Sequence, residues 1–534
     1  MRPSLVRLVP LLGACLLATR ADAAFPDGFL WGTAISGFQT EMGDTPASND
    51  TGSDWWVWAH DADNITAHRV SGDLPEDGPG FYDQFRTQVR RYARRGLASN
   101  ALRLSIEWSR IFPNSTAGVD ASGGITTDVL EQLDALADQD AVRQYRRMLF
   151  RIRGGHMEPF VTVNHFSLPL WIHDPIAARN AFAGTDPQLP PPTGFPGGWL
   201  DTATVEEFRK YSAYLAWKLG RYVDYWAPIN EPLSVAAGGY ANVPGAFASN
   251  FPPGVLSYPG LLQVVLNLVE AQRVGYDAIK QWDLRDANRD GENAAVGAVI
   301  NLIYFVPFTD GSANDEIGAQ HATYLYDRLF PNAIFLGDVD SNANGTIDPG
   351  EHRPELVGHA DFFGLNYYFR GKALKLGAPV TPAIPLFDFL PVFTYQTPER
   401  PFGPLCPTVC TDFGWEIYPP GLREVLAIAG SYGKPVYITE NGIADATDEK
   451  RPAYLVQHLA VLEQAIADNV ADVRGYFHWA LMDNFEWSSG YFPMFGLYRV
   501  DASGQLLPRP SARYFQRIAE ANAIPQDLLD QFGP

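Results

Sequence analysis

Two glutamates stand where a carboxylate could be held for chemistry. Residues 435–442 read PVYITENG and residues 229–232 read INEP, so Glu440 and Glu231 each end an apolar run beside an asparagine. A facing pair of carboxyl groups can protonate a leaving oxygen and attack an anomeric carbon, which are the two tasks of glycoside hydrolysis. A lone glutamate at either place is more often a helix cap or one half of an ion pair, so the rest of the chain has to decide.

Apolar stretches typical of buried strands recur along the chain and alternate with longer helical patterns. Eight such stretches lie at 29–41, 101–110, 157–169, 222–232, 294–307, 361–370, 435–442 and 473–487, and helical patterns lie at 80–95, 202–220, 260–282 and 452–468. Because buried parallel strands read as continuous apolar runs, this alternation predicts an α/β fold, a single (β/α)8 TIM barrel. A doubly wound open sheet is the alternative, but no Gly-x-Gly-x-x-Gly turn follows an early strand.

Long loops are predicted between some of these strands and helices. The proline-rich stretch 185–198 and the stretch 377–411 read as inserted βα loops, and such loops more often wall a pocket than link two domains. One barrel domain is therefore expected over residues 24–534. Its active site should lie where the strands end on their C-terminal side.

Other predicted strand ends bring polar and aromatic side chains to the same end of the barrel as Glu231 and Glu440. The indole rings of Trp479 and Trp487 can stack on the apolar face of a pyranose. Side chains that can form hydrogen bonds to sugar hydroxyls are Gln39, His165, Asn230 and Glu486. The remaining candidates at these positions are Arg103, Asn366 and Tyr368.

Taken together, these stretches resemble the family 1 glycoside hydrolases, the β-glucosidase and β-galactosidase family, from about residue 25 to 519. The matching motifs are FLWGTAISGFQTE, LRLSIEWSRIFP, VNHFSLPLW, INEP, GLNYY, YITENG and DNFEWSSGY followed by FGLYRVD. HDPI, RPAYLVQH and DVRGYFHWAL are most similar to the branch that contains archaeal broad-specificity β-glycosidases.

The resemblance implies a role for each candidate residue. Glu231 would be the acid/base and Glu440 the nucleophile, kept ionised by the guanidinium of Arg103. The glycone subsite would be lined by Gln39, His165, Asn230, Trp479, Glu486 and Trp487, with Glu486 reaching the 4- and 6-hydroxyls. Arg103 and Tyr368 would contact the nucleophile, and Asn366 would line the site nearby. The family pattern also implies a cis peptide bond after Trp479.

The activity implied is that of a retaining exo-β-glycosidase that forms a covalent glycosyl-enzyme and needs no cofactor for catalysis. Its substrates would be β-linked oligosaccharides or aryl and alkyl β-glycosides, carrying glucose and also galactose or fucose. A transglycosidase would use the same double-displacement site and pass the sugar to another sugar or alcohol, so this alternative stays open. The formal charge of −21 makes nucleic acid and anionic membranes poor partners.

Residues 1–23 read as an export signal, with Arg2 and Arg7 before a short apolar run and small residues near Ala23. We therefore expect a secreted or periplasmic protein. The alternative is a lipoprotein anchored through Cys15 of the LGAC motif. After export Cys406 and Cys410 remain, and a Cys-x3-Cys pair in an oxidising compartment most simply forms a local disulfide.

The stretch DSNANGTIDPGE at 340–351 has the spacing of an EF-hand-like calcium loop with Gly345 at its sixth position. Its ligands would be Asp340, Asn342, Asn344, the Thr346 carbonyl, Asp348 and Glu351. An Asn/Gly/Asp-rich turn that binds nothing is the alternative, because no flanking helix pair is evident. A bound calcium ion would be structural.

Overall fold

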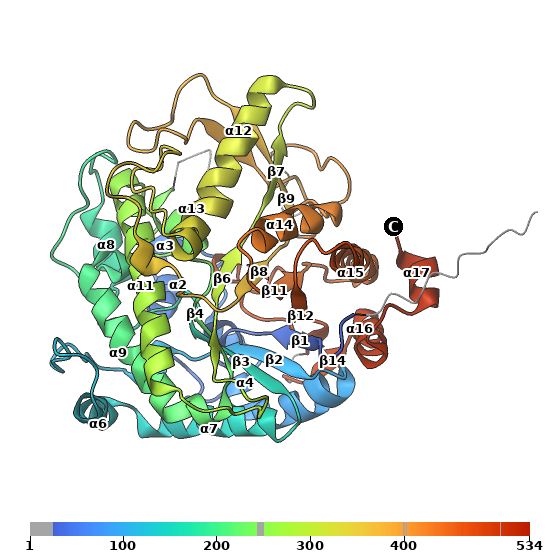
Figure 1. Cartoon of the computed structure of the whole chain (residues 1–534), viewed down its shortest axis with the longest axis horizontal. Helices are drawn as coiled ribbons and strands as arrows, with labels where there is room; N and C mark the ends of the chain where they lie inside the picture. The colour runs from blue at the N-terminus through green and yellow to red at the C-terminus, as the bar shows by residue number, and fades with distance from the viewer. Residues whose placement is uncertain (1–24, 243–249, 399–400, 402, 502–503) are drawn as a thin grey trace, which may run out of the picture.

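The computed structural model describes residues 25–242, 250–398, 401, 403–501 and 504–534 (Figure 1). The predicted signal peptide at 1–23, with Cys15, lies outside the described residues. No helix in the described ranges is long and apolar enough to cross a membrane.

Nine parallel strands build the barrel that carries the candidate residues. They are β1 (Leu30–Ala34), β2 (Ala101–Ser105), β3 (Glu158–Asn164), β4 (Tyr225–Ile229), β5 (Ala295–Val296), β6 (Ala298–Asn301), β8 (Phe363–Asn366), β11 (Val436–Gly442) and β12 (Val473–Trp479). The order β5-β4-β3-β2-β1-β12-β11-β8-β6 begins and ends on pieces of one interrupted strand. A bridge from Asn230 to Val299 joins β4 to β6, so the sheet closes on itself. The predicted (β/α)8 barrel is confirmed.

The interruption between β5 and β6 falls at Gly297. A Cβ atom there would lie 2.1 Å from the ring of Phe362, so a side chain at this position would collide with the barrel interior. The strand can pass the ring only at a glycine.

Two stretches predicted as single strands are each divided. The 294–307 stretch gives β5, β6 and then β7 (Tyr304–Pro307), and the 361–370 stretch gives β8 before β9 (Arg370–Lys375) starts. β7 and β9 leave the barrel and join β10 (Phe389–Val392) in a separate three-stranded sheet. Apolar patterning marks both parts of each stretch as strand, and it does not distinguish pairing inside the barrel from pairing outside it.

Helices surround the barrel and separate its strands, as the helical patterns predicted. The longer ones are α4 (Phe81–Thr87) continuing into η2 (Gln88–Gly96), α6 (Thr127–Leu136), α7 (Gln139–Arg153), α9 (Thr202–Leu219), α10 (Pro232–Tyr240), α11 (Tyr258–Trp282), α12 (Ala313–Thr323), α14 (Pro420–Gly430), α15 (Arg451–Ala467) and α16 (Pro510–Ala521). Shorter helices are α1 (Gly37–Thr40), α2 (Asp54–His60), α3 (Ala62–Thr66), α5 (Trp108–Ile111), α8 (Pro175–Ala181), α13 (Leu329–Pro331) and α17 (Gln526–Phe532). Short 3-10 helices are η1 (Pro75–Asp77), η3 (Gly198–Leu200), η4 (Gly220–Tyr222), η7 (Pro354–Leu356) and η8 (Trp487–Ser489), and short π-helices are η5 (Tyr324–Arg328) and η6 (Asn332–Leu336). A two-stranded sheet is formed by β13 (Tyr498–Val500) and β14 (Leu506–Pro508).

Aromatic rings fill the barrel below the strand ends. Phe160 of β3 packs against Tyr225, Phe362, Tyr437 and Phe477, with ring centroids 5.2 to 5.9 Å apart. This cluster is buried and apolar. It closes the interior, so polar side chains of the same strands can gather only above it, at the C-terminal ends.

Candidate active site

The barrel brings the predicted site residues to one end. Arg103 lies within β2, His165 directly follows β3, Asn230 and Glu231 follow β4, Asn366 ends β8 with Tyr368 just beyond, Glu440 lies in β11 and Trp479 ends β12. Gln39 lies on α1 after β1, and Glu486 and Trp487 lie in the segment after β12. All ten are buried. Arg103 lies in the middle of its strand, and its long side chain reaches Glu440.

Glu440 is held by one cation and one hydroxyl. Arg103 Nη1 forms a buried ion pair with Glu440 Oε1, and the Tyr368 hydroxyl donates to Oε2 at 2.6 Å. Burial and the neighbouring Glu440 keep the pKa of Tyr368 well above its usual value, so Tyr368 remains a donor. Both contacts favour a negatively charged Glu440.

Glu231 has neutral partners. Asn366 Nδ2 donates to Oε1 at 2.7 Å and the Ser234 hydroxyl donates to Oε2 at 2.8 Å. Burial and then the charge of Glu440 raise the pKa of Glu231 to about 7, against the opposing effect of these hydrogen bonds and of Arg103. A carboxyl group in this setting still carries its proton in mildly acidic solution.

A chain of hydrogen bonds leads from Glu231 away from Glu440. The Ser234 hydroxyl lies 3.0 Å from the hydroxyl of Tyr326, which accepts from Asn301 Nδ2 at 3.2 Å. The sequence analysis missed these three residues. Ser234 follows Glu231 by three residues at the start of α10, a spacing that places neighbours on one helix face, whereas nothing in the sequence marks Tyr326.

His165 forms part of an aromatic wall. Its ring stacks on Trp479 and Trp487 with centroids 5.9 and 6.0 Å away. Burial, aided by Arg103, lowers the pKa of His165 far below its usual value, so the ring is neutral. Asn230 Nδ2 meets His165 Nε2 at 3.3 Å, and Nδ1 has no hydrogen-bond partner within the described ranges. That nitrogen is buried. The peptide bond after Trp479 is cis, as the resemblance implied.

Gln39 and Glu486 form a second polar corner. The Gln39 amide nitrogen donates to Glu486 Oε2 and to Asn484 Oδ1, each at 3.1 Å, while Ser36 donates to its oxygen at 2.7 Å. Burial and then the charge of Glu440 raise the pKa of Glu486 to about 8. This corner therefore offers both a donor and an acceptor in one place. Asn484 was not predicted, although it lies in the same motif as Glu486.

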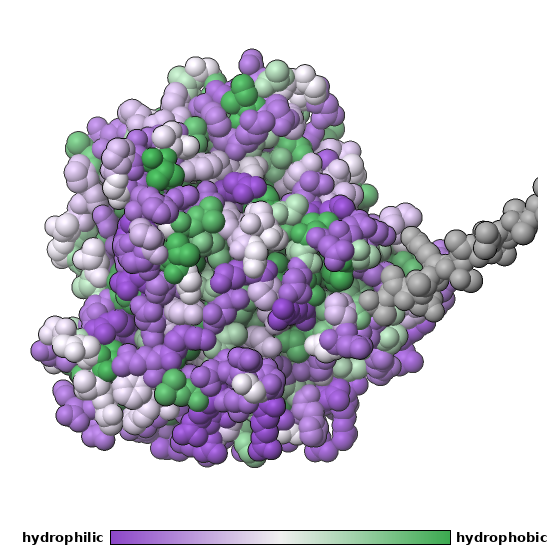
Figure 2. All heavy atoms as spheres, viewed as in Figure 1, coloured by the Kyte–Doolittle hydropathy of each residue, from purple (hydrophilic) through white to green (hydrophobic). Residues whose placement is uncertain are grey.

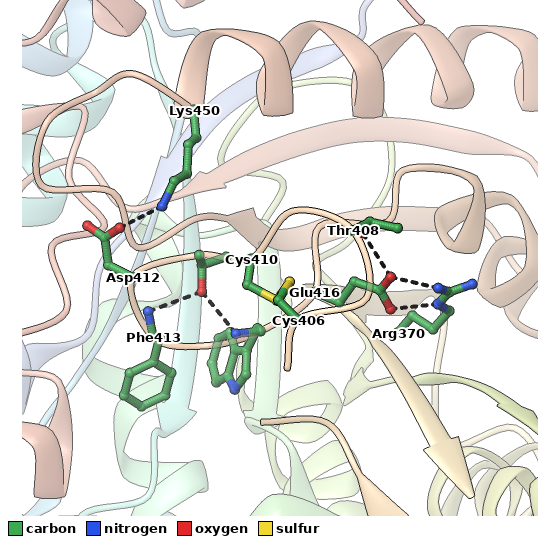
Figure 3. Close-up of a disulfide and its surroundings, with 10 residues drawn as sticks. Arg370, Cys406, Thr408, Cys410, Asp412, Phe413, Glu416 and Lys450 are labelled. Carbon is green, nitrogen blue, oxygen red and sulfur yellow. Dashed lines mark hydrogen bonds and ion pairs between the residues drawn. A yellow bond between two sulfur atoms is a disulfide. The ribbon is translucent and has the colours of Figure 1, made fainter. Parts of the chain in front are cut away.

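The predicted disulfide lies in the loop that also carries Asp412 and Glu416 (Figure 3). Cys406 and Cys410 are bonded, and Glu416 of the same loop forms a two-pronged ion pair with Arg370 at the start of β9. Trp415, which lies between Cys410 and Glu416 in the sequence, packs against the ring of Tyr368, with ring centroids 5.6 Å apart. The loop thus supports the side chain that donates to Glu440.

The 340–351 loop is closed by its own hydrogen bonds. Asp340 accepts from the backbone N–H groups of Asn344 and Gly345 at 3.0 and 2.7 Å, and Glu351 accepts from the backbone N–H groups of Ser341 and Asp348, both at 2.9 Å. Among the described residues no group of three or more His, Cys, Asp or Glu side chains is arranged to hold a metal ion. Calcium binding here stays a prediction.

Comparison with known proteins places the chain among the glycosidases. The model of glycosyl hydrolase family 1 matches residues 21–179 and 189–524. A β-galactosidase of Pyrococcus woesei is 39% identical over 528 residues, covering 95% of this chain and 99% of that protein. One of Saccharolobus solfataricus is 36% identical over 518 residues, covering 95% and 97%. The solved β-glycosidase of Thermosphaera aggregans has a TM-score of 0.79 at 32% identity, covering 95% of this chain and 99% of that one.

The closed barrel with two glutamates at its strand ends is the architecture of a (β/α)8 glycoside hydrolase. The chain belongs to glycosyl hydrolase family 1 and is an enzyme of the β-glucosidase and β-galactosidase type. The resemblance found in the sequence is confirmed. Enzymes of this family act without a catalytic cofactor.

Proposed function

We propose that the protein is a retaining exo-β-glycosidase, with Glu440 as nucleophile and Glu231 as acid/base. One observation carries the proposal: Glu440 is paired with a guanidinium, whereas Glu231 meets only neutral donors and has a pKa raised to about 7. One carboxylate is thereby charged and ready to attack, and one carboxyl group is ready to donate.

The first step forms the glycosyl-enzyme. A carboxylate oxygen of Glu440 attacks the anomeric carbon while the bond to the leaving oxygen breaks, and that oxygen takes the proton of Glu231. The sugar is then held on Glu440 as an ester of inverted configuration.

The second step reverses these roles. Esterified Glu440 carries no charge, so a main cause of the raised Glu231 pKa is removed. Glu231 becomes ionised and accepts a proton from water, whose oxygen attacks the anomeric carbon from the opposite face as the ester bond breaks. Two inversions restore the β configuration.

Sugar recognition is assigned to the groups around the two glutamates. The Gln39 and Glu486 corner offers a donor and an acceptor to two hydroxyls. Trp479 and Trp487 would stack on the apolar sugar face. Glucose, galactose and fucose β-glycosides are the expected substrates, and a panel of nitrophenyl glycosides tests this. Activity confined to α-linked sugars would overturn it.

The catalytic roles are tested with azide. Glu440→Gly should abolish hydrolysis, because no nucleophile remains, and azide entering the cavity should attack from the same face and give the α-glycosyl azide. Glu231→Ala should slow substrates with poor leaving groups about 10²- to 10⁴-fold. Activated aryl glycosides should still form the intermediate in that variant, and azide should release the β-azide.

The product anomers decide the assignment, because each variant is the control for the other. The same anomer from both variants, or an inverted first-formed sugar from the parent enzyme, contradicts it. The retaining mechanism also requires the two carboxyl groups to lie about 5–5.5 Å apart in the working enzyme. Product analysis with an added alcohol acceptor separates hydrolysis from transglycosylation.

We also propose that the enzyme is exported, as residues 1–23 suggest, with the Cys406–Cys410 disulfide formed outside the cytoplasm. N-terminal sequencing of the secreted protein tests this, and a start near residue 24 is expected. A lipid-modified N-terminus at Cys15 would favour the lipoprotein alternative instead.

A further inference from the structure

Eight arginines without an ion-pair partner lie on neighbouring helical segments outside the barrel. They are Arg86, Arg90, Arg91, Arg94 and Arg95 on α4 and η2, and Arg146, Arg147 and Arg151 on α7. None forms an ion pair within the described ranges, whereas Arg143 and Arg153 of α7 do. α7 packs against both α4 and η2, so the eight form one surface, here called the arginine face. Hydrophilic side chains predominate along the lower edge of Figure 2, where Figure 1 places α7.

A cleft of about 610 Å³ opens in the arginine face. Its charged lining consists of Arg90, Arg94, Arg95, Arg151, His156 and Glu520. Two of the guanidinium groups are held by backbone carbonyls: Arg94 donates to Gly155 O at 3.0 Å, and Arg151 donates to Arg86 O at 3.3 Å. The cleft is therefore lined by four arginines, two of them held in place, and by the carboxylate of Glu520.

Helix electrostatics explain only part of this arrangement. Arg94, Arg95 and Arg151 lie in last turns, where a cation complements the helix dipole. Arg90, Arg91, Arg146 and Arg147 lie nearer the middle of their segments, and Arg86 lies where α4 continues directly into η2, so these five gain little from the dipole. Their mutual repulsion would be offset by an anionic partner.

The arginine face lies at the end of the barrel opposite to Glu231 and Glu440. η2 and α7 lead through residues 97–100 and 154–157 into the first residues of β2 and β3, which are the N-terminal strand ends. A partner bound there leaves the active site open.

The described chain also begins beside the cleft. Glu520 lines the cleft from α16, and Asn522, two residues later, accepts from the Phe25 backbone N–H at 3.0 Å and donates to its carbonyl at 2.7 Å.

An exposed aromatic ring indicates which kind of anionic partner fits the arginine face. Phe150 lies on α7 between Arg147 and Arg151, and its residue is 65% exposed. Arginines flanking an exposed phenylalanine are typical of helices that rest on anionic lipid, where the cations meet phosphates and the ring enters the headgroup boundary. A free phosphate or a sulfated polysaccharide would leave the ring in water.

We propose that the arginine face docks the enzyme on a membrane surface rich in anionic phospholipid headgroups, with the active site facing away. The net charge of −21 does not prevent this. At physiological ionic strength charges are screened beyond about 8 Å, so the local arginines dominate the encounter. The rest of the acidic surface favours this one orientation.

Vesicle sedimentation tests the proposal. The exported form, which starts at residue 24, should sediment with vesicles of equal phosphatidylglycerol and phosphatidylcholine at low salt, and should be released at 0.5 M NaCl. The cleft variant Arg90→Glu/Arg95→Glu should lower the partition coefficient at least about 25-fold, about fivefold for each arginine removed. Residues 1–23 are absent from every protein compared, so they contribute no affinity for lipid.

A matched variant controls for net charge. Arg273→Glu/Arg423→Glu changes the charge by the same amount on α11 and α14, at arginines of surface ion pairs, and should bind as the parent does. Nitrophenyl glycoside hydrolysis and a melting curve show that each variant is folded. Equal losses in both variants, no sedimentation of the parent, or binding to a sulfated polysaccharide without binding to vesicles would each overturn the proposal.

Discussion

Glu231 and Glu440 are the same residue type, and their neighbours give them different chemistry. Glu440 meets the guanidinium of Arg103 and the hydroxyl of Tyr368, while Glu231 meets the amide of Asn366 and the hydroxyl of Ser234. The distinction comes from two strands, β2 and β8, and from the start of α10, none of which is local in sequence to both glutamates. This is why sequence motifs predict the two glutamates, whereas the difference in their electrostatic surroundings is evident only in the folded structure.

The hydrogen bond from Ser234 should lower the pKa of Glu231. This hydrogen bond favours the ionised carboxylate, so Ser234→Ala should raise the pKa of Glu231 above its value of about 7. One hydrogen bond to a carboxylate corresponds to about 1 kcal/mol, or somewhat less than one pH unit. The basic limb of the kcat/KM profile, which reports loss of the Glu231 proton, should therefore move upward by about half to one unit.

Two further variants separate this effect from packing. Ser234→Thr keeps the hydroxyl and should keep the limb in place. Tyr326→Phe removes the hydroxyl that faces Ser234 and should give a smaller upward shift. If Ser234→Ala lowers kcat with an unmoved limb, Ser234 supports the shape of the site and does not tune Glu231.

Sequence motifs predicted residues that the fold brings together at one end of the barrel, and they did not predict partners from segments without a motif. Gln39 and Glu486 were predicted from separate motifs, and their 3.1 Å contact spans 447 positions. Tyr326 belongs to η5, a segment without chemical motif, and reaches Glu231 only through Ser234. Contacts of this kind depend on how a long βα loop folds back, which periodicity does not encode.

At the scale of elements, barrel strands were predicted and their limits were not. Buried runs such as 435–442 match β11 closely, because both faces of a barrel strand are covered. The runs 294–307 and 361–370 continue into β7 and β9 with no change in apolar character. Only the closed geometry of the barrel ends β6 and β8 at Asn301 and Asn366.

The 340–351 loop gives a prediction at this scale. Gly345 adopts φ +81° and the backbone N–H groups of Asn344 and Gly345 turn onto Asp340, a compact turn that brings the loop oxygens toward its inside. If calcium binds at 100 times its Kd, the gain of about 2.7 kcal/mol is lost in chelator. The melting temperature should then fall by about 3 °C, with unchanged turnover of the folded enzyme.

The chelator experiment has an internal control. Asp348→Ala removes a proposed ligand and should make the melting curve insensitive to both chelator and added calcium. An unchanged melting curve of the parent protein in chelator would show that the loop is a turn closed by its own hydrogen bonds alone.

Across the whole molecule, buried charge supports the active-site end. Glu41, Asp50 and Glu107 are buried near one another, and the guanidinium of Arg110 lies 2.9 Å from Glu41 and 4.0 Å from Asp50. Glu107 accepts from Ser105 at 3.0 Å and from Ser167, and its carboxylate packs against Gly37, the first residue of the helix that carries Gln39. Three carboxyl groups facing one cation cannot all ionise without leaving uncompensated negative charge.

This network should make stability depend on pH. Burial, reinforced by Glu41 and Asp50, raises the pKa of Glu107 to about 8 from 4.5. Between pH 4.5 and 8 the folded state therefore still holds a proton on Glu107 that the unfolded state has already released. A group with a raised folded pKa gives its full stabilisation below its unfolded pKa and loses it as the pH rises through the folded pKa. The free energy of unfolding should fall across this window.

Glu107→Gln tests the point because it resembles the protonated acid at every pH. Relative to the parent protein, its free energy of unfolding should improve by at least about 1 kcal/mol between pH 5.5 and pH 8.5, as measured by urea unfolding at both values. The exposed Glu449→Gln removes the same charge from the surface and should follow the parent at both pH values. Parallel pH curves for Glu107→Gln and the parent would mean that Glu107 is ionised in the folded protein, with Arg110 and the serine hydroxyls together compensating all three carboxylates.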